Sequence, residues 1–398
     1  MNPLDDFSSL HQSSAFCKVQ VNITIMKKLN EQRYFHSIFA SIKKIIRKRS
    51  QVSKSMNDQD FRMVVSPGDV IGKKYRVIEE ISNGAFSNVY LCKNTKSQKT
   101  VIIKGYKSIV EFSECAYREI AVMRILNKLD PQNENFVQYY GKFVHKGHVC
   151  MIIQQYGMSL LDAFKIINYR PFSSTPLRHI IYKISSSLKI LHKNGLIHTD
   201  IKLENVLLPI NFDATILDAN HISDPSSDDF STKSDASESP IDARLIDFGS
   251  MASSRKWHTN LATTRRYRAP EILMGLRWGT ECDIWSLGCL LIEMATGEIS
   301  FDAKDDVEHI FLIQHMIGPY PKWMSQQCPI QKLRKYFVGE LMRAGDDWKS
   351  ALDMPPLTNY LKFDPELEDL ALKMLKPNPF ERLTIDEVLN HQFFDCCH

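Results

Sequence analysis

The alternation of apolar and polar residues predicts a β-rich region that begins near Gly68. The segments KYRVIEEI, SNVYLCKN and TVIIKGY alternate in this way, which is typical of consecutive antiparallel strands with one buried face. Two more strands are predicted within FVQYYGKFVHKGHVCMIIQQY. Between these groups, ECAYREIAVMRILNKL has apolar residues at helical spacing, which predicts a helix with one buried face. The members of that apolar set are Val122, Ile125, Leu126 and Leu129.

From Ser159 onward the pattern is mostly helical. The predicted fold class is therefore α+β with two lobes. A small β-rich lobe covers residues 69–156, a larger α-helical lobe covers residues 157–395, and the boundary lies near Gln154 to Gly157.

Two segments depart from this globular pattern. Residues 1–68 hold eleven Lys and Arg against five acids and are expected to form a basic, largely disordered extension. Within it, IKKIIRKR (Ile42 to Arg49) fits a solvated tail, a nuclear import signal, or a short amphipathic helix for a membrane surface or a partner. Residues 211–240 hold seven acids, seven serines and one lysine, and this composition predicts a mobile insert.

The bulk composition excludes several classes of protein. With 398 residues, 43% of them hydrophobic, the chain can bury a large core. A net charge of +4 is too small to indicate nucleic-acid binding, and none is expected. Nine cysteines without C-x-x-C spacing indicate reduced thiols rather than a disulfide framework or a zinc site. No secretory signal or membrane span is predicted, so we expect an intracellular protein in the nucleus and/or cytoplasm.

The polar stretch HTDIKLEN, residues 198–205, is the first candidate site. It places Asp200, Lys202, Glu204 and Asn205 within six positions, after an apolar helical pattern and before a short β-branched run. Such a loop can present reactive groups from a rigid scaffold, although a solvated turn would have the same local pattern.

Other candidates are ambiguous when each is taken alone. ISNGAFSNVY, from Ile81 to Tyr90, is a small-residue turn that can lay backbone amides over phosphates or form an ordinary hairpin. Lys104 ends an apolar strand and needs a partner if buried; Glu119, on the following helix, is the natural one. Asp247 follows a β-run in LIDFGSMA, where a carboxylate suits Mg²⁺ and a simple turn is the alternative.

The order of these features resembles that of a protein kinase. A small-residue loop, a strand lysine, a helix glutamate, D-x-K-x-x-N and D-F-G occur in the family's sequence and spacing. YRAPE, CDIWSLGCLLIEMATG and ERLT follow, so the resemblance extends from about Gly68 to Phe394. It implies the bilobal protein kinase fold, ATP and Mg²⁺ as cofactors, and protein substrates.

The resemblance also implies roles for individual residues. Asp200 would accept or orient the proton of the substrate hydroxyl, and Lys202 would neutralise charge on the transferred phosphoryl group. Asn205 and Asp247 would hold Mg²⁺. The residues expected to bind ATP are Ile81, Ser82, Asn83, Gly84, Ala85, Phe86, Ser87, Val89, Lys104, Glu119, Gln154 and Tyr156. Structural roles are expected for a Glu271–Arg382 ion pair and for Asp283, which would brace the catalytic loop.

Within the family, the chain resembles a divergent LAMMER (CLK, dual-specificity) kinase. The basis is HTD in place of H-R-D, together with GDVIGKKYRVIEEI, DFGSMA, TTRRYRAPEI and the insert before D-F-G. Only Glu308, His309 and an apolar pattern remain of the motif that names this subfamily, at EHIFLIQH. DYRK and SR-protein kinases are the near alternatives. The resemblance implies Arg/Ser-rich substrates such as splicing factors and a monomeric enzyme.

Two departures qualify these implications. Ser82 and Ser87 stand where the family has the first and third glycines of its nucleotide loop, which raises the alternative of a catalytically weak pseudokinase that acts as a scaffold. Thr199 replaces the arginine that anchors a phosphate on the activation segment, so activity is expected not to depend on phosphorylation at Thr263 or Thr264. Glu204 and Asp162 are the expected substrate-recognition residues, because each carboxylate can pair with a substrate arginine.

Overall fold

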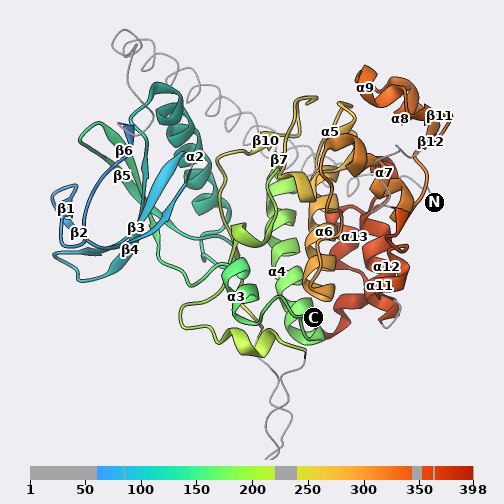
Figure 1. Cartoon of the computed structure of the whole chain (residues 1–398). Coiled ribbons are helices and arrows are strands. Elements are labelled where there is room, and N and C mark those ends of the chain that lie inside the picture. Colours follow the sequence, from blue (N-terminus) through green and yellow to red (C-terminus); the bar gives the residue numbers. More distant parts are fainter. Residues whose placement is uncertain (1–60, 85, 220–239, 343–351, 362–363, 398) are drawn as a thin grey trace, which may run out of the picture. The chain divides into compact units, whose positions relative to one another are not determined.

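The computed structural model describes residues 61–84, 86–219, 240–342, 352–361 and 364–397. They divide into two compact units (Figure 1). The first contains the chain up to Val122 together with Gly141–Ile152, and the second contains Met123–Tyr140 and everything from Ile153 onward. The predicted basic helix at Ile42–Arg49 lies outside the described residues, as does most of the acidic insert.

The first unit is built on a six-stranded sheet of order β1-β2-β3-β4-β6-β5. The strands predicted from alternation are present, and β1 to β4 pair antiparallel in sequence order. The long helix α2 carries the predicted helical stripe, and the boundary between the two units falls within it, after Val122. The bounds are β1 Val70–Ile71, β2 Tyr75–Asn83, β3 Ser87–Asn94, β4 Thr100–Tyr106, α2 Val110–Leu129, β5 Tyr139–His145 and β6 His148–Gln154.

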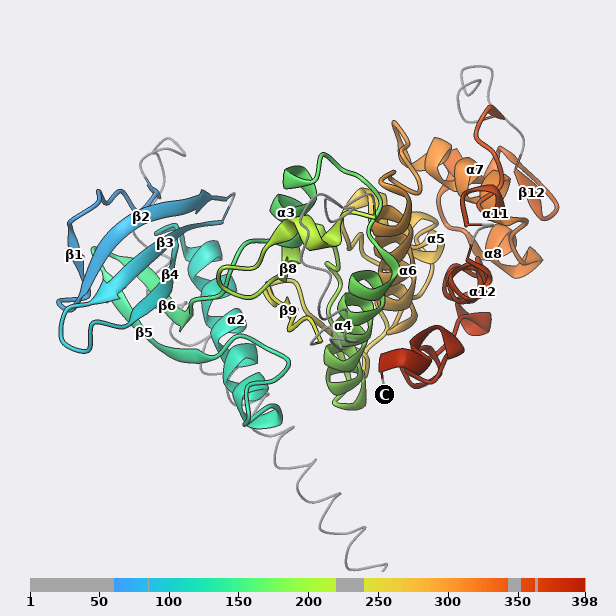
Figure 2. The same ribbon diagram turned by 90° about the horizontal axis from the view of Figure 1, so that it is seen from below.

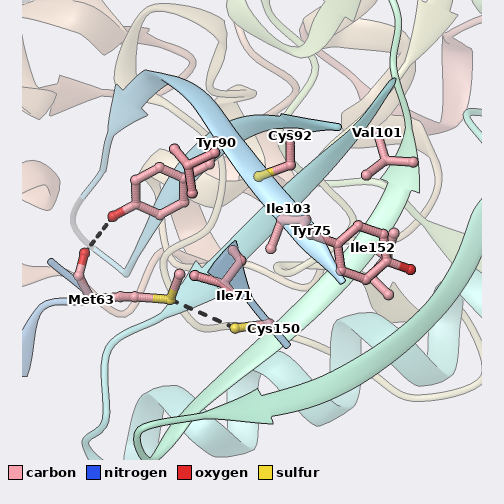
Figure 3. Close-up of a cluster of buried hydrophobic side chains, with 10 residues drawn as sticks. Met63, Ile71, Tyr75, Tyr90, Cys92, Val101, Ile103, Cys150 and Ile152 are labelled. Carbon is pink, nitrogen blue, oxygen red and sulfur yellow. Dashed lines mark hydrogen bonds between the residues drawn. The ribbon is translucent and has the colours of Figure 1, made fainter. Parts of the chain in front are cut away.

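The core of this unit extends beyond the expected domain boundary. Met63, predicted to belong to a disordered extension, is 1% exposed and packs among apolar side chains of the sheet (Figure 3). Its carbonyl accepts a hydrogen bond from the Tyr90 hydroxyl. A Cβ atom added to Gly105 would lie 2.7 Å from the Met63 sulfur, so the strand needs glycine there. The prediction of disorder is therefore wrong for residues 61–68, because one fully buried methionine within the short run FRMVV gives no periodic signal.

The second unit is mostly helical, and α6 lies among its helices (Figures 1 and 2). Almost every side chain of α6 is buried, as expected for a helix that is apolar on all sides, and α4 and α12 pack against it. The helices are α3 Leu160–Ile166, α4 Ser174–Lys193, α5 Pro270–Leu273, α6 Glu281–Thr296, α7 Asp306–Ile317, α8 Lys322–Gln327, α9 Gln331–Arg334, α11 Thr358–Leu361, α12 Pro365–Met374 and α13 Ile385–Leu389.

Short strands and 3₁₀ turns complete this unit. The strands pair as β7 with β10, β8 with β9, and β11 with β12. Their bounds are β7 Leu196–Ile197, β8 Val206–Leu207, β9 Arg244–Leu245, β10 Ala252–Ser253, β11 Phe337–Val338 and β12 Leu341–Met342. The 3₁₀ turns are η2 Leu203–Asn205, η3 Ala214–Leu217, η4 Arg265–Tyr267, η5 Pro379–Glu381 and η6 Gln392–Cys397.

The buried ion pair expected from the resemblance is present. Arg382 donates to both carboxylate oxygens of Glu271 at 2.7 Å, and both side chains are fully buried. Two parallel, charge-assisted hydrogen bonds in one plane hold the segment before α6 to the segment before α13.

The start of the predicted mobile insert has a defined structure. Asp213 caps η3, in which Ala214 and Leu217 are buried. The Asp218 carboxylate forms an ion pair with the Arg170 guanidinium, with Nη1 and Oδ2 2.6 Å apart. The expected mobility is thus wrong for residues 211–219, since two buried apolar side chains and a cap suffice to fix a short turn that composition alone does not indicate.

Candidate active site

The polar stretch 198–205 lies between β7 and β8 in the second unit. The loop was expected to follow a helix directly, but the short strand β7 lies between α4 and the stretch, and the last three residues of the stretch form the η2 turn. Backbone hydrogen bonds of these small elements fix both ends of the stretch. The polar residues are thus held by their neighbours on each side.

Four polar side chains meet within this stretch and the segment before α5. Lys202 Nζ lies 2.8 Å from an Asp200 carboxylate oxygen. The Asn205 amide donates to the Asp200 carbonyl at 2.8 Å and to its carboxylate at 2.9 Å. The Thr264 hydroxyl donates to the other Asp200 oxygen at 2.7 Å and accepts from Lys202 at 3.1 Å. A carboxylate, a fixed positive charge and a hydroxyl thus lie within hydrogen-bond distance of one another.

Asp283 holds the backbone at the start of this stretch in place, as the resemblance implied. This residue is fully buried in the first turn of α6. Its two carboxylate oxygens accept the backbone amides of His198 and Thr199, both at 2.8 Å, and His192 lies 2.9 Å from one of them. A buried carboxylate with three such partners fixes the backbone directly before Asp200.

The pairing of β8 with β9 brings Asn205 and Asp247 to one end of a short ladder. Val206 pairs with Leu245, and the Ile246 amide donates to the Asn205 carbonyl at 2.9 Å. Asp247 follows directly, with a left-handed φ of 64°. Positive φ is uncommon for a non-glycine residue and is concentrated at functional sites. The insert connects the other ends of β8 and β9, so it leaves this ladder on the side away from both residues.

The donor set at this end suits Mg²⁺. Because Asn205 uses its amide nitrogen to bond Asp200, its amide oxygen remains the ligand that it can offer. Within the described ranges, no group of three or more His, Cys, Asp or Glu could hold a metal by itself. Mg²⁺ commonly takes one or two protein oxygens and completes its coordination with substrate phosphates and water. One carboxylate and one amide oxygen fit that mode.

The predicted Lys104–Glu119 ion pair is present in the first unit. Lys104 Nζ lies 2.8 and 3.0 Å from the two Glu119 carboxylate oxygens, and Glu119 is buried. The Tyr106 hydroxyl donates to the same carboxylate at 2.6 Å. Tyr106 was not predicted, although it lies two residues after Lys104 and alternation places both on one face of β4.

The predicted nucleotide loop is the turn between β2 and β3. Gly84 donates its amide to the Ser87 carbonyl at 2.9 Å, and Ala85 lies outside the described residues. Ser82 is exposed and Ser87 is buried, and neither has positive φ. The backbone at both positions is therefore accessible to serine without strain. The other residues predicted for this loop are Ile81, Asn83, Phe86 and Val89; Ile81 and Phe86 are exposed, and Val89 pairs with Lys104 across β3 and β4.

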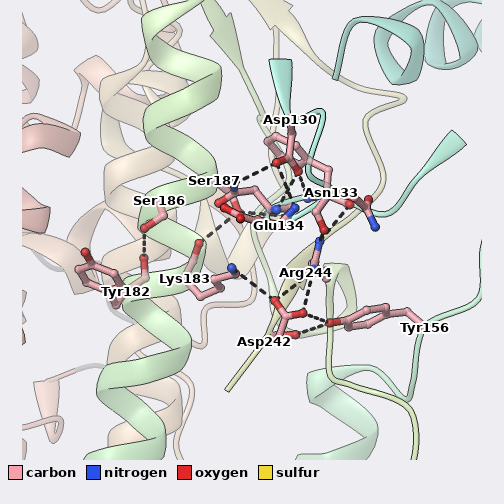
Figure 4. Close-up of polar contacts among 12 residues, drawn as sticks. Asp130, Asn133, Glu134, Tyr156, Tyr182, Lys183, Ser186, Ser187, Asp242 and Arg244 are labelled. Atoms are coloured by element: carbon pink, nitrogen blue, oxygen red, sulfur yellow. Dashed lines mark hydrogen bonds and ion pairs between the residues drawn. The ribbon is translucent and has the colours of Figure 1, made fainter. Parts of the chain in front are cut away.

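Tyr156, predicted to bind ATP, belongs to a polar network of the second unit (Figure 4), and Gln154, also predicted to bind ATP, contacts Asn133 of that network. The Tyr156 hydroxyl donates to the Asp242 backbone carbonyl at 2.6 Å and to its carboxylate at 2.8 Å. Gln154 accepts from the amide side chain of Asn133 at 2.8 Å. Burial, together with the hydrogen bond to Asp242, raises the pKa of Tyr156 to about 12.

Arg244 joins the parts of this network that are distant in sequence. Its guanidinium donates to Asp242 at 2.6 and 3.0 Å and to the Asn133 carbonyl. Burial would raise the pKa of Asp242, but the bonds from Arg244 and Tyr156 outweigh it and lower the pKa. Sequence reasoning missed both Asp242 and Arg244, because they lie beside the insert and carry no motif.

The predicted substrate-recognition residues differ in their surroundings. Asp162 is exposed, accepts from the helix-capping Ser159 hydroxyl and pairs with Lys165 at 3.0 Å, so local helix structure already accounts for it. Glu204 is exposed on η2. Its charge raises the pKa of Glu293, a buried residue of α6 whose pKa is raised first by burial itself and which accepts a hydrogen bond from Tyr267. Glu293 was not predicted.

The two activation-segment threonines also differ. Thr263 has a φ of 64°, and its carbonyl accepts from Arg268 at 2.8 Å. Thr264 was expected as a phosphate acceptor, but its hydroxyl is engaged by Asp200 and Lys202. The structure thus places Thr264 within the polar cluster itself.

Comparison with known proteins decides the family. The family model described as protein kinase domain matches residues 75–394. The chain belongs to the protein kinase family. Human dual specificity protein kinase CLK1 is 33% identical to this kinase over 87% of its chain and 71% of CLK1. Serine/threonine-protein kinase AFC1 of Arabidopsis thaliana is 32% identical over 85% of this chain and 74% of AFC1. A crystal structure of a kinase domain matches with a TM-score of 0.72 and 26% identity, covering 85% of this chain and all of that one.

These matches confirm the predicted fold and the relationship to the CLK dual-specificity kinases. The kinase domain implies the use of ATP and a divalent metal and of protein substrates. The remnant of the LAMMER motif lies on α7, where Glu308 and His309 are buried and Glu308 accepts the Lys304 amide at 2.6 Å. In the parts of the chain that the structure describes, no helix is long and apolar enough to cross a membrane.

Proposed function

We propose that this kinase transfers the γ-phosphoryl group of ATP, with Mg²⁺, to Ser or Thr of Arg/Ser-rich proteins such as splicing factors. Tyrosine would be modified by autophosphorylation, as its dual-specificity relatives suggest. The observation that supports transfer most directly is the Asp200–Lys202–Asn205–Thr264 cluster. It has the proton acceptor, the positive charge and the fixed geometry that phosphoryl transfer requires.

Each residue of the cluster has a distinct task in this proposal. Asp200 accepts or orients the proton of the substrate hydroxyl, while Lys202, 2.8 Å away, supplies positive charge where negative charge develops. Asn205 holds Asp200 in place and, with Asp247, would hold Mg²⁺, which supplies charge neutralisation when bound. Lys104, fixed by Glu119, would hold the α- and β-phosphates. Most of the rate then comes from positioning rather than from covalent chemistry.

The test is an ATP-Mg²⁺ phosphotransfer assay on the parent protein and the Asp247→Ala variant. We expect turnover by the parent and its loss in the variant, with ATP binding measured in parallel. Binding without turnover in the parent would favour the scaffold alternative, which the serines at 82 and 87 raised from the sequence.

The preference for arginine is supported by the position of Glu204. Its carboxylate is exposed on η2, where a substrate guanidinium can reach it. A guanidinium can bond a carboxylate in bidentate geometry, which an ammonium cannot. Asp162 remains a weaker candidate because Ser159 and Lys165 already bond it.

Peptides that differ only beside the acceptor test this preference. We expect Arg-Ser peptides to be turned over faster than Ala-Ser and Glu-Ser peptides, and Glu204→Ala to lower kcat/KM for the Arg-Ser peptide roughly tenfold. Asp302→Ala is the matched control, since Asp302 is an exposed carboxylate paired with Arg266 at 3.8 Å. Equal turnover of all three peptides by the parent would leave an unspecialised Ser/Thr kinase.

We also propose that activity is independent of phosphate on the activation segment. Thr199 carries no charge to receive a phosphate. Thr264→Ala is unsuitable as the test because it would remove a bond to Asp200. Phosphatase treatment and Thr263→Ala should each leave peptide turnover within about twofold, and loss of activity in both would contradict the proposal.

The remaining proposals concern the location of the protein in the cell and the role of the acidic insert. The basic run Ile42–Arg49 supports a nuclear as well as a cytoplasmic location, and the acidic insert would adjust location or partners rather than catalysis. The exit of the insert on the side of β8–β9 away from Asp247 supports this. Deletion of residues 224–238 should leave peptide turnover within a few-fold.

A further inference from the structure

Thr199, which directly precedes Asp200, contacts the segment that follows Asp247. Its hydroxyl donates to the Ser250 carbonyl at 3.0 Å and lies 3.1 Å from the Ser250 hydroxyl. The Ser250 hydroxyl in turn lies 3.4 Å from the His198 carbonyl. Thr199 is 3% exposed, whereas Ser250 lies at the surface. A buried hydroxyl on one segment is thus satisfied by the other.

The contact is the last of a series that runs between the two segments. The Ser254 amide donates to the Gly195 carbonyl at 3.0 Å, and β7 pairs with β10 through Leu196 with Ser253 and Ile197 with Ala252. The Thr199–Ser250 bond continues this series toward Asp200 and Asp247. Unlike the backbone bonds of β7 with β10, it depends on a side-chain hydroxyl, so a single substitution can remove it.

The backbone of Thr199 is also unusual. Its φ is 68°, in the left-handed region that β-branched residues rarely adopt. Asp283 fixes the amides of His198 and Thr199 on one side, and Ser250 fixes the hydroxyl on the other. A strained conformation persists only where its surroundings hold it, which these contacts do.

We propose that Thr199 and Ser250 form a hydroxyl clamp that positions Asp247 relative to Asp200 without a phosphate or an ion pair. Thr199 is a positioning residue, since it acts through the two carboxylates. This inference rests on the proposed function for its effect on rate. The physical contact itself does not depend on that function.

Thr199→Val tests the clamp, because valine keeps the size and branching of threonine and removes the hydroxyl. In the nucleotide-free protein we expect amide hydrogen exchange across residues 246–254 to become roughly three- to tenfold faster, the effect of one buried hydrogen bond. kcat should fall by a similar factor and the Mg²⁺ concentration for half-maximal rate should rise, while KM for the peptide stays unchanged. Thr199→Ser should restore all of these values.

Two further variants sharpen the test. Ser250→Ala should have a smaller effect, because the Ser250 carbonyl still accepts from Thr199. Thr296→Val is the matched control, since that hydroxyl bonds the Ile292 carbonyl at the end of α6 and should affect none of these readouts. Parent-like exchange and kcat in Thr199→Val would overturn the clamp. A parent protein without phosphotransfer would instead overturn the proposed function, and the exchange measurement would still decide the clamp.

Discussion

The catalytic loop and the nucleotide hairpin are held in opposite ways. In residues 198–205, His198, Thr199 and Asn205 are at most 5% exposed, and each takes part in hydrogen bonds with other segments. In the hairpin between β2 and β3, Ile81 and Phe86 are more than half exposed. The loop expected to do the chemistry is fixed by many partners, whereas the hairpin expected to cover phosphates has few. Departures from the family pattern should therefore cost more in the first region than in the second.

The largest effect should come from Asp200→Asn. The amide cannot accept a proton, so kcat should fall by about 10²- to 10⁴-fold while KM for ATP changes little. Steady-state kinetics with a peptide substrate measures both. A loss of less than tenfold, with an unchanged melting temperature, would mean that residues 198–205 do not carry out the chemistry.

Among the effects on stability, the largest should come from replacing Asp283, which holds the backbone of residues 198–205 in place. Asp283→Ala removes a buried carboxylate that accepts two backbone amides and contacts His192, so the free energy of unfolding should fall by about 3 kcal/mol. Denaturant unfolding measures it, with Asp302→Ala as an exposed control expected to change it by less than about 0.5 kcal/mol. Equal losses in the two variants would contradict the difference in burial.

Burial in the second unit also predicts sensitivity to acid. Burial, with the charges of Arg268 and Arg265, lowers the pKa of His309 to about 3, and neither ring nitrogen has a hydrogen-bond partner in the described part of the chain. In the unfolded chain this histidine binds a proton near pH 6.5, whereas the native form stays neutral. The unfolded state thus gains protons first, and stability is lost as the pH falls below 6.5.

His309→Leu should remove this effect. Between pH 7 and pH 5 the variant should lose about 2 kcal/mol less unfolding free energy than the parent. The difference between the two proteins at pH 8, where both carry a neutral side chain, gives the effect of packing alone. Parallel pH profiles for parent and variant would show that His309 is protonated in the native state.

The smallest effect should follow from restoring glycine in the nucleotide hairpin. Neither Ser82 nor Ser87 has positive φ, so Ser82→Gly and Ser87→Gly should each change KM for ATP by less than about threefold. Gly84→Ala is the contrasting variant, because its added Cβ would lie 3.2 Å from the Ser87 carbonyl oxygen. A tenfold gain in ATP affinity from either glycine would show that the serines weaken this kinase.

Sequence patterns predicted the regular parts of the molecule well. Alternation located the strands of the sheet, and motif spacing predicted the contacts of Lys104 with Glu119 and of Glu271 with Arg382. These contacts follow from elements whose geometry is periodic and whose motifs are specific. The division into residues 69–156 and 157–395 remains a prediction.

Isolated residues that act over long distances could not be predicted. Arg244 bonds a carbonyl more than a hundred positions away, and Glu293 resembles any other acid near a helix end until its burial is known. Thr264 could be placed in the activation segment, but the bond of its hydroxyl to Asp200 depends on how that segment folds back. Local pattern contains no information on such contacts.

The position of Met63 shows that the folded part of the first unit begins before the family match. The family match begins at Tyr75, yet the side chain that fills the space above Gly105 comes from twelve residues earlier. A shortened chain that starts at Gly68 would leave a cavity beside the residue that follows Lys104, and a vacated methionine site in a core costs stability. Shortened proteins should therefore retain residues from Phe61 onward, because a buried core side chain of the described residues precedes the family match.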